Sequence, residues 1–251
     1  MSALQDRCLH NDRQCTARRF PLTSEVIAAV TPRRPEGGAQ IELLVVPAAS
    51  VVPIPDGATL AEAATLPMNG LTAMLGLDLL GLAEGATLAV TGGAGLLASY
   101  VIPLAKERGL RVLADAKPAD EELVRSFGAE DVLPRGEGFV DAARNLVPHG
   151  VDGLYDTALL GREAFPAIRD GGAMAVVRGW DGSPTERGIE VRPVFVRTAL
   201  ERTDWLEHLR ERASAGALRL RVAEEVPPER AARAHELMEA GGLRGRAVIV
   251  F

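Results

Sequence analysis

The sequence predicts an α/β protein built on a doubly wound parallel sheet. Three observations lead to this fold class. Short apolar strands alternate with helical segments between residues 87 and 177, a glycine-rich turn joins the first of these strands to its helix, and the chain closes on the apolar run AVIVF. Strand–helix alternation favours parallel pairing through right-handed crossovers. The closing run predicts a further strand that pairs into a sheet.

The segment before this alternation is expected to hold short strands and two helices. Residues 1–23 show neither strand nor helix periodicity and are taken as an atypical tail. Clusters of proline and glycine separate the apolar runs that follow, as is typical of strands joined by turns. The expected strands are 26–30, 41–47 and 51–55, and the expected helices are 59–65 and 71–82.

The alternating part and the end of the chain are assigned by the same patterns. Strands are expected at 87–91, 110–114, 131–133, 153–157, 173–177, 189–196 and 218–222, and in the final AVIVF. Helices are expected at 95–108, 119–127, 138–146, 162–169 and 198–214, and in PPERAARAHELMEAGG, which has proline at its start and glycine at its end.

Composition excludes several classes of function. The net charge of -6 and the pI of about 5.4 argue against a nucleic-acid-binding surface. Cys8 and Cys15 are too few for a disulfide framework or a metal site, and the polar N-terminus lacks the apolar core of a signal peptide, so a cytoplasmic protein is expected. The uncharged stretch 86–105 is long enough to suggest a membrane span, but its glycine cluster favours a strand, a turn and a helix.

The most specific local signal is the run LAVTGGAGLLASYV. Gly93, Gly95 and Ala98 satisfy the GxGxxA pattern after an apolar strand and at the start of a helix, which is the context of a dinucleotide-binding turn. The glycines allow close approach of a diphosphate, and the helix N-terminus offers free N–H groups and a positive dipole end. The expected cofactor-binding residues of this turn are Gly92, Gly93, Ala94, Gly95, Leu96 and Leu97.

Polar residues after later strands extend this candidate site. Asp115, after the second strand of the alternation, is a candidate for the ribose hydroxyls of NAD, whereas Lys117 is a candidate for the 2′-phosphate of NADP. Asp115 and Lys117 could equally well be solvated side chains without a role in binding, and sequence alone does not decide this. Of the two cofactors, NADP(H) is expected ahead of NAD(H). Because ligands of open sheets lie beyond the carboxyl ends of strands, further residues are expected at the nicotinamide half: Asp156, Thr157, Arg178 and Gly179.

The chain resembles the medium-chain dehydrogenase/reductase superfamily, in its zinc-independent, quinone oxidoreductase-like branch. The similar segments include GGAQIELLVVPAASVVPIPDG, EAATLPMNGLTA, GATLAVTGGAGLLASYVIPLAK, GVDGLYDTALLG and GGLRGRAVIVF, in the family's order. The resemblance implies a Rossmann domain at 63–197 and a partial GroES-like domain formed by 24–62 and 198–251. Most of the N-terminal GroES-like domain is expected to be missing, and Leu96 and Ala98 stand where this branch usually has glycine. The zinc ligands of other members are absent, so no metal is expected.

The resemblance also implies an activity. Hydride would pass from the nicotinamide to a quinone or to the β-carbon of an enone, and without a metal the developing oxyanion needs hydrogen-bond donors or water. Asn69 and Thr72 match the family segment that approaches the nicotinamide, and they are expected to orient the reactants. The alternative for Asn69 is a cap of a helix that starts near Leu71.

Three other functions are alternatives to this one. A short-chain dehydrogenase needs a Tyr-x-x-x-Lys pair, but the residues four positions after Tyr100 and Tyr155 are Leu104 and Leu159. A Rossmann methyltransferase fits less well, because the closing GroES-like strand is foreign to it. A truncated relative that binds nucleotide or a partner without turnover remains the main alternative. By analogy with the family, a homodimer that pairs through an edge strand at 189–196 is also expected.

Overall fold

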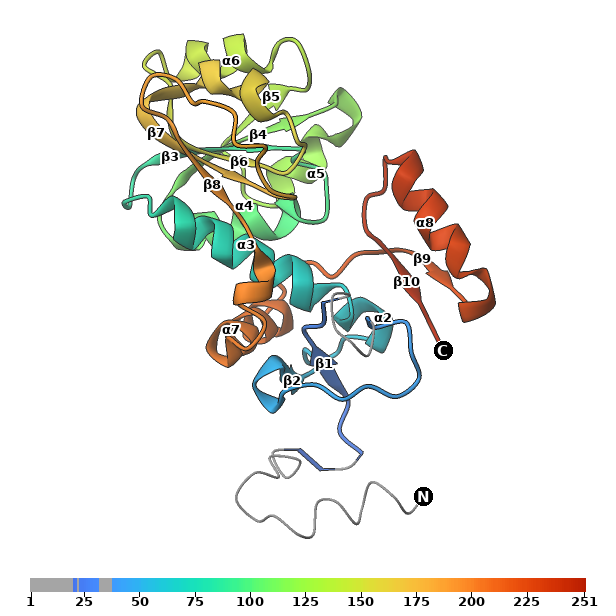
Figure 1. The fold of residues 1–251 in the computed structure, drawn as a ribbon. Coiled ribbons are helices and arrows are strands. Elements are labelled where there is room, and N and C mark those ends of the chain that lie inside the picture. The colour runs from blue at the N-terminus through green and yellow to red at the C-terminus, as the bar shows by residue number, and fades with distance from the viewer. Residues whose placement is uncertain (1–19, 22, 32–37) are drawn as a thin grey trace.

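A doubly wound parallel sheet forms the centre of the molecule (Figure 1). The computed structural model describes residues 20–21, 23–31 and 38–251. Six strands pair in parallel in the order β5-β4-β3-β6-β7-β8, so the chain starts in the middle and winds outward in both directions. Their bounds are β3 Thr87–Thr91, β4 Arg111–Ala116, β5 Asp131–Pro134, β6 Val151–Asp156, β7 Ile168–Val176 and β8 Glu190–Pro193. The predicted fold class is confirmed.

Helices cover both faces of this sheet, and the strand pleat divides the core between them. Leu88 and Val90 of β3 join the larger cluster of buried residues, whereas Ala89 between them joins the smaller one on the other face. The connecting helices are α4 Ala98–Glu107, η3 Pro118–Asp120, α5 Glu121–Ser126, α6 Phe139–Leu146 and η4 Gly161–Ala167. The last of these is a 3₁₀ helix with Pro166 inside it, where the sequence pattern predicted a longer helix over 162–169.

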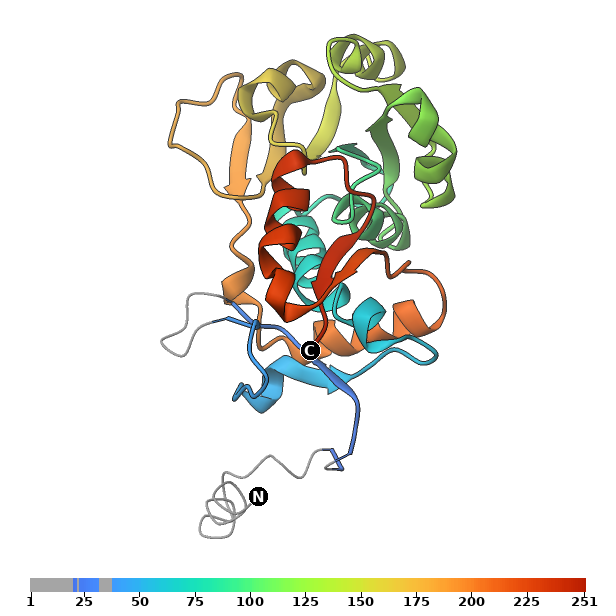
Figure 2. The ribbon, with the colours of Figure 1, turned by 90° about the vertical axis from the view of Figure 1, so that its right-hand side faces the viewer.

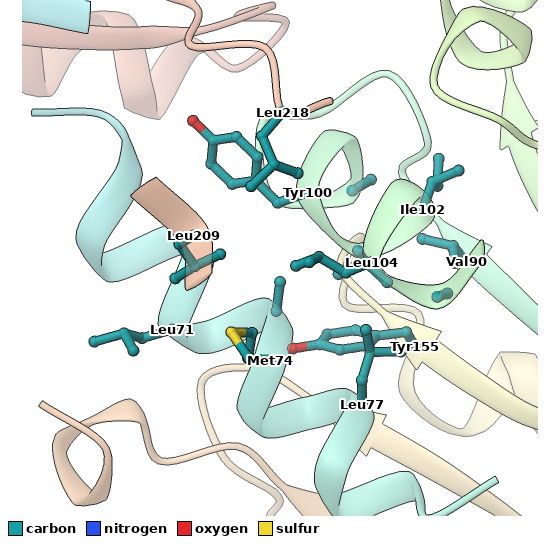
Figure 3. Close-up of a cluster of buried hydrophobic side chains, with 14 of the residues drawn as sticks. Leu71, Met74, Leu77, Val90, Tyr100, Ile102, Leu104, Tyr155, Leu209 and Leu218 are labelled. Atoms are coloured by element: carbon teal, nitrogen blue, oxygen red, sulfur yellow. The ribbon is translucent and has the colours of Figure 1, made fainter. Parts of the chain in front are cut away.

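Helix α3 (Leu66–Leu80) packs across one face of the sheet and carries part of the candidate site. It follows the short α2 (Leu60–Ala63), whose N-cap Thr59 forms a capping box with Glu62, and it ends at Gly81 in the left-handed conformation. Figure 3 shows the buried side chains beside it, with the Tyr155 hydroxyl directed toward the helix. That hydroxyl donates to the carbonyl of Thr72 at 2.6 Å.

The N-terminal segment adds a small sheet that shares the larger core cluster. Strands β1 (Val26–Ala28) and β2 (Val51–Pro53) pair antiparallel, η2 (Ala48–Ser50) precedes β2, and α7 (Thr203–Ser214) packs against β2 (Figure 2). The prediction of a strand over 41–47 is wrong. Ile41, Leu43 and Val45 are exposed and the segment forms no strand in the structure, so this apolar run is not buried in a sheet.

The C-terminal segment forms a third, separate sheet. Strands β9 (Val222–Val226) and β10 (Arg246–Ile249) pair in parallel across η6 (Pro228–Arg230) and α8 (Ala231–Ala240). In Figure 2 this unit lies in front of α3. The predicted strand at 218–222 is wrong apart from Val222, because Leu218 is instead buried in the core below α7. The helix predicted from 198 begins only at Thr203, after the 3₁₀ turn η5 (Val196–Thr198).

Two predictions concern the ends and a possible membrane span. Cys8, Cys15 and almost all of the predicted tail lie outside the described residues. The uncharged stretch 86–105 forms β3, the glycine turn and most of α4. Within the described part of the chain, no helix has the length and apolar character needed to cross a bilayer. The domain boundaries predicted from the sequence stay a prediction.

Candidate functional site

A cavity of about 420 Å³ lies at the carboxyl ends of the central strands. We call it the strand-edge cavity. Its walls come from α3, the glycine turn after β3, the loop after β6, the residues after β7 and the segment between α8 and β10. Its volume falls within the range of small-molecule sites. The predicted site residues that line it are Asn69, Thr72, Gly92, Ala94, Gly95, Leu96, Leu97, Thr157 and Arg178.

The glycine turn is built by close backbone contacts. Gly92 has φ +69°, and a Cβ there would lie 2.9 Å from the Thr157 hydroxyl oxygen. A Cβ on Gly93 would lie 2.6 Å from the Asp115 carbonyl oxygen, so these two positions require glycine. Gly95 donates its N–H to the Gly92 carbonyl at 2.8 Å. The N–H groups of Leu96 and Leu97 bind no other group of the described chain and stand ahead of α4.

Asp115 does not occupy the position expected of a ribose ligand. It is buried, and it does not line the strand-edge cavity. Its Oδ1 accepts the Gly93 N–H at 3.0 Å, while its carbonyl accepts the same N–H at 3.1 Å. Burial raises the pKa of this carboxyl above its usual value, against the opposing effect of the hydrogen bonds from Gly93 and Gly92. Asp115 therefore stabilises the glycine turn through its hydrogen bonds to Gly93 and does not face the cavity.

Asp156 also supports a loop and does not line the cavity. The buried carboxylate accepts hydrogen bonds from the Thr91 hydroxyl at 2.7 Å and from the N–H groups of Leu160 and Gly161 at 3.0 and 2.8 Å. Thr157, its neighbour, does line the cavity and donates its hydroxyl to the Thr91 carbonyl. Of these two residues, which were both expected to face the cofactor, only Thr157 lines the cavity.

Asn69 and Thr72 lie together on α3 and face the strand-edge cavity. Asn69 donates from Nδ2 to the Thr65 carbonyl at 3.2 Å, and Thr72 donates from Oγ1 to the Met68 carbonyl at 2.6 Å. Asn69 therefore keeps one N–H and its carbonyl oxygen for a ligand, whereas Thr72 presents an acceptor. The alternative that Asn69 caps a helix near Leu71 is wrong, because α3 begins at Leu66.

Three predicted site residues follow the strands β7 and β4, and only one of them lines the cavity. Arg178 lines the cavity with an unusual backbone φ of +66°. Gly179, which follows it, has φ +89° and does not line the cavity. Lys117 is exposed at the end of β4 and also lies outside the cavity wall.

Comparison with known proteins identifies the family. Residues 127–249 match the family model described as zinc-binding dehydrogenase. Over 128 residues the chain is 32% identical to the 2-methylene-furan-3-one reductase of Solanum lycopersicum, a match that covers 50% of this chain and 32% of that protein. Over 130 residues it is 33% identical to polyketide synthase GfsB of Streptomyces halstedii, covering 43% of this chain and 2% of the synthase. The chain thus spans about a third of the first relative and a small part of the second.

Solved structures agree in fold. An alcohol dehydrogenase superfamily protein of Novosphingobium aromaticivorans superimposes with a TM-score of 0.81 at 22% identity, covering 93% of this chain and 76% of that one. Mycobacterial Rv1454c complexed with NADPH gives 0.79 at 23% identity, covering 94% and 76%. Residues 127–249 are thus similar to a zinc-binding dehydrogenase domain, and the described chain shares the fold of an alcohol dehydrogenase superfamily protein. The resemblance seen in the sequence is confirmed at this level.

Sequence reasoning missed one wall of the strand-edge cavity. The segment from Gly241 to Arg246 lines it, and Arg244 holds the segment in place by pairing with Asp120 through Nε at 2.9 Å and Nη2 at 2.6 Å. Arg135, directly after β5, lines it as well. Four arginines but no Asp or Glu side chain are among the lining residues, namely Arg135, Arg178, Arg244 and Arg246.

A second arginine contact joins the same C-terminal unit to the glycine turn. Arg221 donates from Nη2 to the Ala94 carbonyl at 3.0 Å, and its guanidinium lies 5.0 Å from the Phe127 ring centroid. Its Nε and Nη1 are buried and lack a hydrogen-bond partner in the described structure. The hydrogen bond between Arg221 and Ala94 joins residues 127 positions apart, so no local pattern signals it. Among the described residues, no three His, Cys, Asp or Glu side chains gather as metal ligands would.

Proposed function

We propose that this protein is a zinc-independent, NADP(H)-dependent reductase of α,β-unsaturated carbonyl compounds or quinones. The observation that carries the proposal is the strand-edge cavity, where a glycine turn, a helix N-terminus and arginine side chains converge without any carboxylate. The tomato relative is named as an enone reductase, and a structural neighbour with TM-score 0.68 and 20% identity is the CurK enoyl reductase. Together they favour an activated double bond as the acceptor.

The glycine turn fits a dinucleotide. A Cβ on Gly95 would meet the Gly92 carbonyl at 3.0 Å, so a larger side chain would fill the cradle that a diphosphate needs. The N–H groups of Leu96 and Leu97 would bind the diphosphate, and the arginines of the cavity would offset its charge. When bound, the cofactor supplies a hydride to the β-carbon of the enone, and the α-carbon takes a proton.

Residues around the ends of β4 and β5 favour NADP(H) over NAD(H). Asp115, the candidate ribose ligand, is occupied with Gly93. Lys117 is exposed after β4, and Arg135 follows β5, where its N–H donates to the Ala116 carbonyl of β4. Two cations at this edge, where Asp115 is bound to Gly93 and Asp120 is paired with Arg244, suit a 2′-phosphate better than a ribose diol. We therefore assign Lys117 and Arg135 to the 2′-phosphate.

The chain's own polar groups suit hydride transfer without a protein acid. The free N–H of Asn69 is the donor that can stabilise an enolate oxygen, and the Thr72 oxygen can accept from the carboxamide of the nicotinamide or from a hydroxyl. Apart from arginine, no ionisable side chain lines the cavity. The proton at the α-carbon is therefore expected from water.

Consumption of NADPH tests this function. The purified chain is mixed with NADPH or NADH and with a simple enone or a quinone, in the presence and absence of a chelator, and cofactor absorbance and substrate loss are followed. We expect NADPH to be oxidised in a one-to-one ratio with substrate and without effect of the chelator. Tight NADPH binding without consumption by any acceptor would support the non-catalytic nucleotide-binding alternative.

A pair of variants tests the cofactor assignment separately. Lys117→Ala and Arg135→Ala should weaken NADPH binding by roughly tenfold each, as expected for loss of a charge-assisted phosphate contact, and leave NADH binding within about twofold. Binding is measured by the fluorescence of the reduced cofactor, so it does not depend on turnover. Equal losses for both cofactors would contradict the 2′-phosphate assignment.

A further inference from the structure

Arg178 holds a backbone conformation that its residue type disfavours. Arg178 follows the end of β7 and has φ +66°, in the left-handed region that strains any residue with a Cβ. The next residue, Gly179, also has a positive φ, +89°, but glycine adopts it without strain. Such strain persists where the surrounding structure enforces it and is concentrated at functional sites. The question is what the arginine side chain does there.

The guanidinium of Arg178 has no partner among the residues that the structure describes. Arg178 is exposed to the strand-edge cavity and forms no hydrogen bond or ion pair with any described residue. Arg187, another arginine with positive φ, is different, because it binds Asp170 Oδ1 at 2.9 Å and the carbonyls of Ile168 and Phe165. Leu159, also at positive φ, does not line the cavity. Arg178 alone combines the strain with an unpaired charge in the site.

Its place in the sheet separates it from the diphosphate. The glycine turn follows β3, and β7 lies two strands away across β6. Two strand spacings of about 4.8 Å put the end of β7 roughly 10 Å from the turn. Arg178 therefore stands at the nicotinamide end of the cavity, to which α3 also contributes Asn69 and Thr72. No carboxylate lines the cavity to neutralise it.

We propose that Arg178 binds an anionic group of the substrate, so that the preferred substrate is an α,β-unsaturated carbonyl compound that also carries a carboxylate. A guanidinium forms two parallel hydrogen bonds with a carboxylate, which fixes orientation as well as affinity. This inference rests on the proposed function and adds the substrate class to it. Arg178 is then a specificity residue rather than the cofactor ligand expected from the sequence.

The test compares an enone acid with the methyl ester of the same acid. Wild type should have the higher kcat/KM for the acid, and Arg178→Gly should lower the acid-to-ester ratio by roughly ten- to a hundredfold, through KM. Glycine adopts φ +66° without strain, so this variant keeps the fold. Arg178→Lys should retain part of the ratio, and Leu159→Gly, which relieves similar strain outside the cavity wall, should leave the ratio unchanged.

A binding measurement separates this inference from the proposed function. The saturated acid and its ester are added to the NADPH-loaded protein, and the thermal unfolding midpoint is recorded. The acid should raise the midpoint of wild type but not of Arg178→Gly, even if neither enone is reduced. Equal effects of acid and ester, or a loss of NADPH affinity in Arg178→Gly with an unchanged acid-to-ester ratio, would overturn the role of Arg178.

Discussion

Asp115 Oδ1 and the N–H of Gly93 form a hydrogen bond of 3.0 Å that ties the end of β4 to the glycine turn. The carbonyl of Asp115 binds the same N–H at 3.1 Å. These two hydrogen bonds hold Gly93 so close to the Asp115 carbonyl oxygen that a Cβ on residue 93 would clash with it. An acidic residue at the end of this strand thus shapes the turn that would bind phosphate, and in this chain it is not free to bind ribose.

This contact predicts an unusual dependence of stability on pH. Burial, the largest influence, holds the pKa of Asp115 above its usual 3.8. The folded state therefore binds the proton more tightly than the unfolded state, and the stability so gained is present at low pH and lost as pH rises through the folded pKa. Compared with Asp115→Asn, wild type should lose free energy of unfolding as the pH rises above the usual pKa of 3.8. Urea unfolding at a series of pH values measures this, and a wild type that gains stability relative to Asp115→Asn as the pH rises would contradict it.

Gly95 predicts the cofactor affinity of the turn. Gly95→Asp should lower NADPH affinity by more than about a hundredfold, because the carboxylate would occupy the space and the positive field meant for the diphosphate. Gly95→Ala adds only a methyl group near the Gly92 carbonyl and should cost less, which separates volume from charge. Cofactor fluorescence gives the affinity, and circular dichroism checks the fold. An unchanged affinity in Gly95→Asp would remove the phosphate assignment.

The turn was predictable because its signal is local. β3 begins and ends at the residues expected from TLAVT, and the glycines that directly follow it indicate the turn. The orientation of Asp115 was not predictable, since a strand end offers its side chain to either face. The wall that carries Arg244 was missed for another reason. Its contact with Asp120 spans 124 residues, and only the folded chain brings these residues together. Similarly, the apolar run 41–47 has the composition of a strand but forms none in the structure, where Ile41, Leu43 and Val45 are exposed.

Gly76 and Tyr155 predict how tightly α3 is held over the sheet. A Cβ on Gly76 would lie 2.2 Å from the Tyr155 hydroxyl oxygen and 2.3 Å from two ring carbons. Gly76→Ala should destabilise the fold by about 2–3 kcal/mol, since neither the helix nor the buried ring can move freely. The double variant Gly76→Ala/Tyr155→Leu should lose less stability than the sum of the losses of the two single variants, because the smaller side chain at 155 leaves room for the added methyl group. Chemical denaturation of all four proteins measures this coupling, and strict additivity would contradict the contact.

Tyr155→Phe isolates the hydrogen bond from the packing. The Tyr155 hydroxyl donates to the carbonyl of Thr72, which lies in the helix turn that faces the cavity. Its removal should cost about 1–2 kcal/mol, because it leaves a buried carbonyl without this donor. If the bond also positions Thr72, NADPH affinity should fall more than in a variant of equal stability elsewhere, such as Leu206→Val in α7. Equal affinities in the two variants would limit the bond to a structural role.

The edge position of strand β8 leads to a prediction of the oligomeric state. It is the outer strand of the six-stranded sheet as described, and we propose that a second copy pairs with this edge. The N–H of Val194 points inward to the Val176 carbonyl, so alternation along the strand directs the N–H of Val191 outward, while Pro193 has none to offer. Light scattering at micromolar concentration should give a dimer for wild type and a monomer for Val191→Pro, with similar circular dichroism. A wild-type monomer would remove the proposal, and a dimer that survives Val191→Pro would move the interface to another surface, such as the exposed Leu43 and Val45.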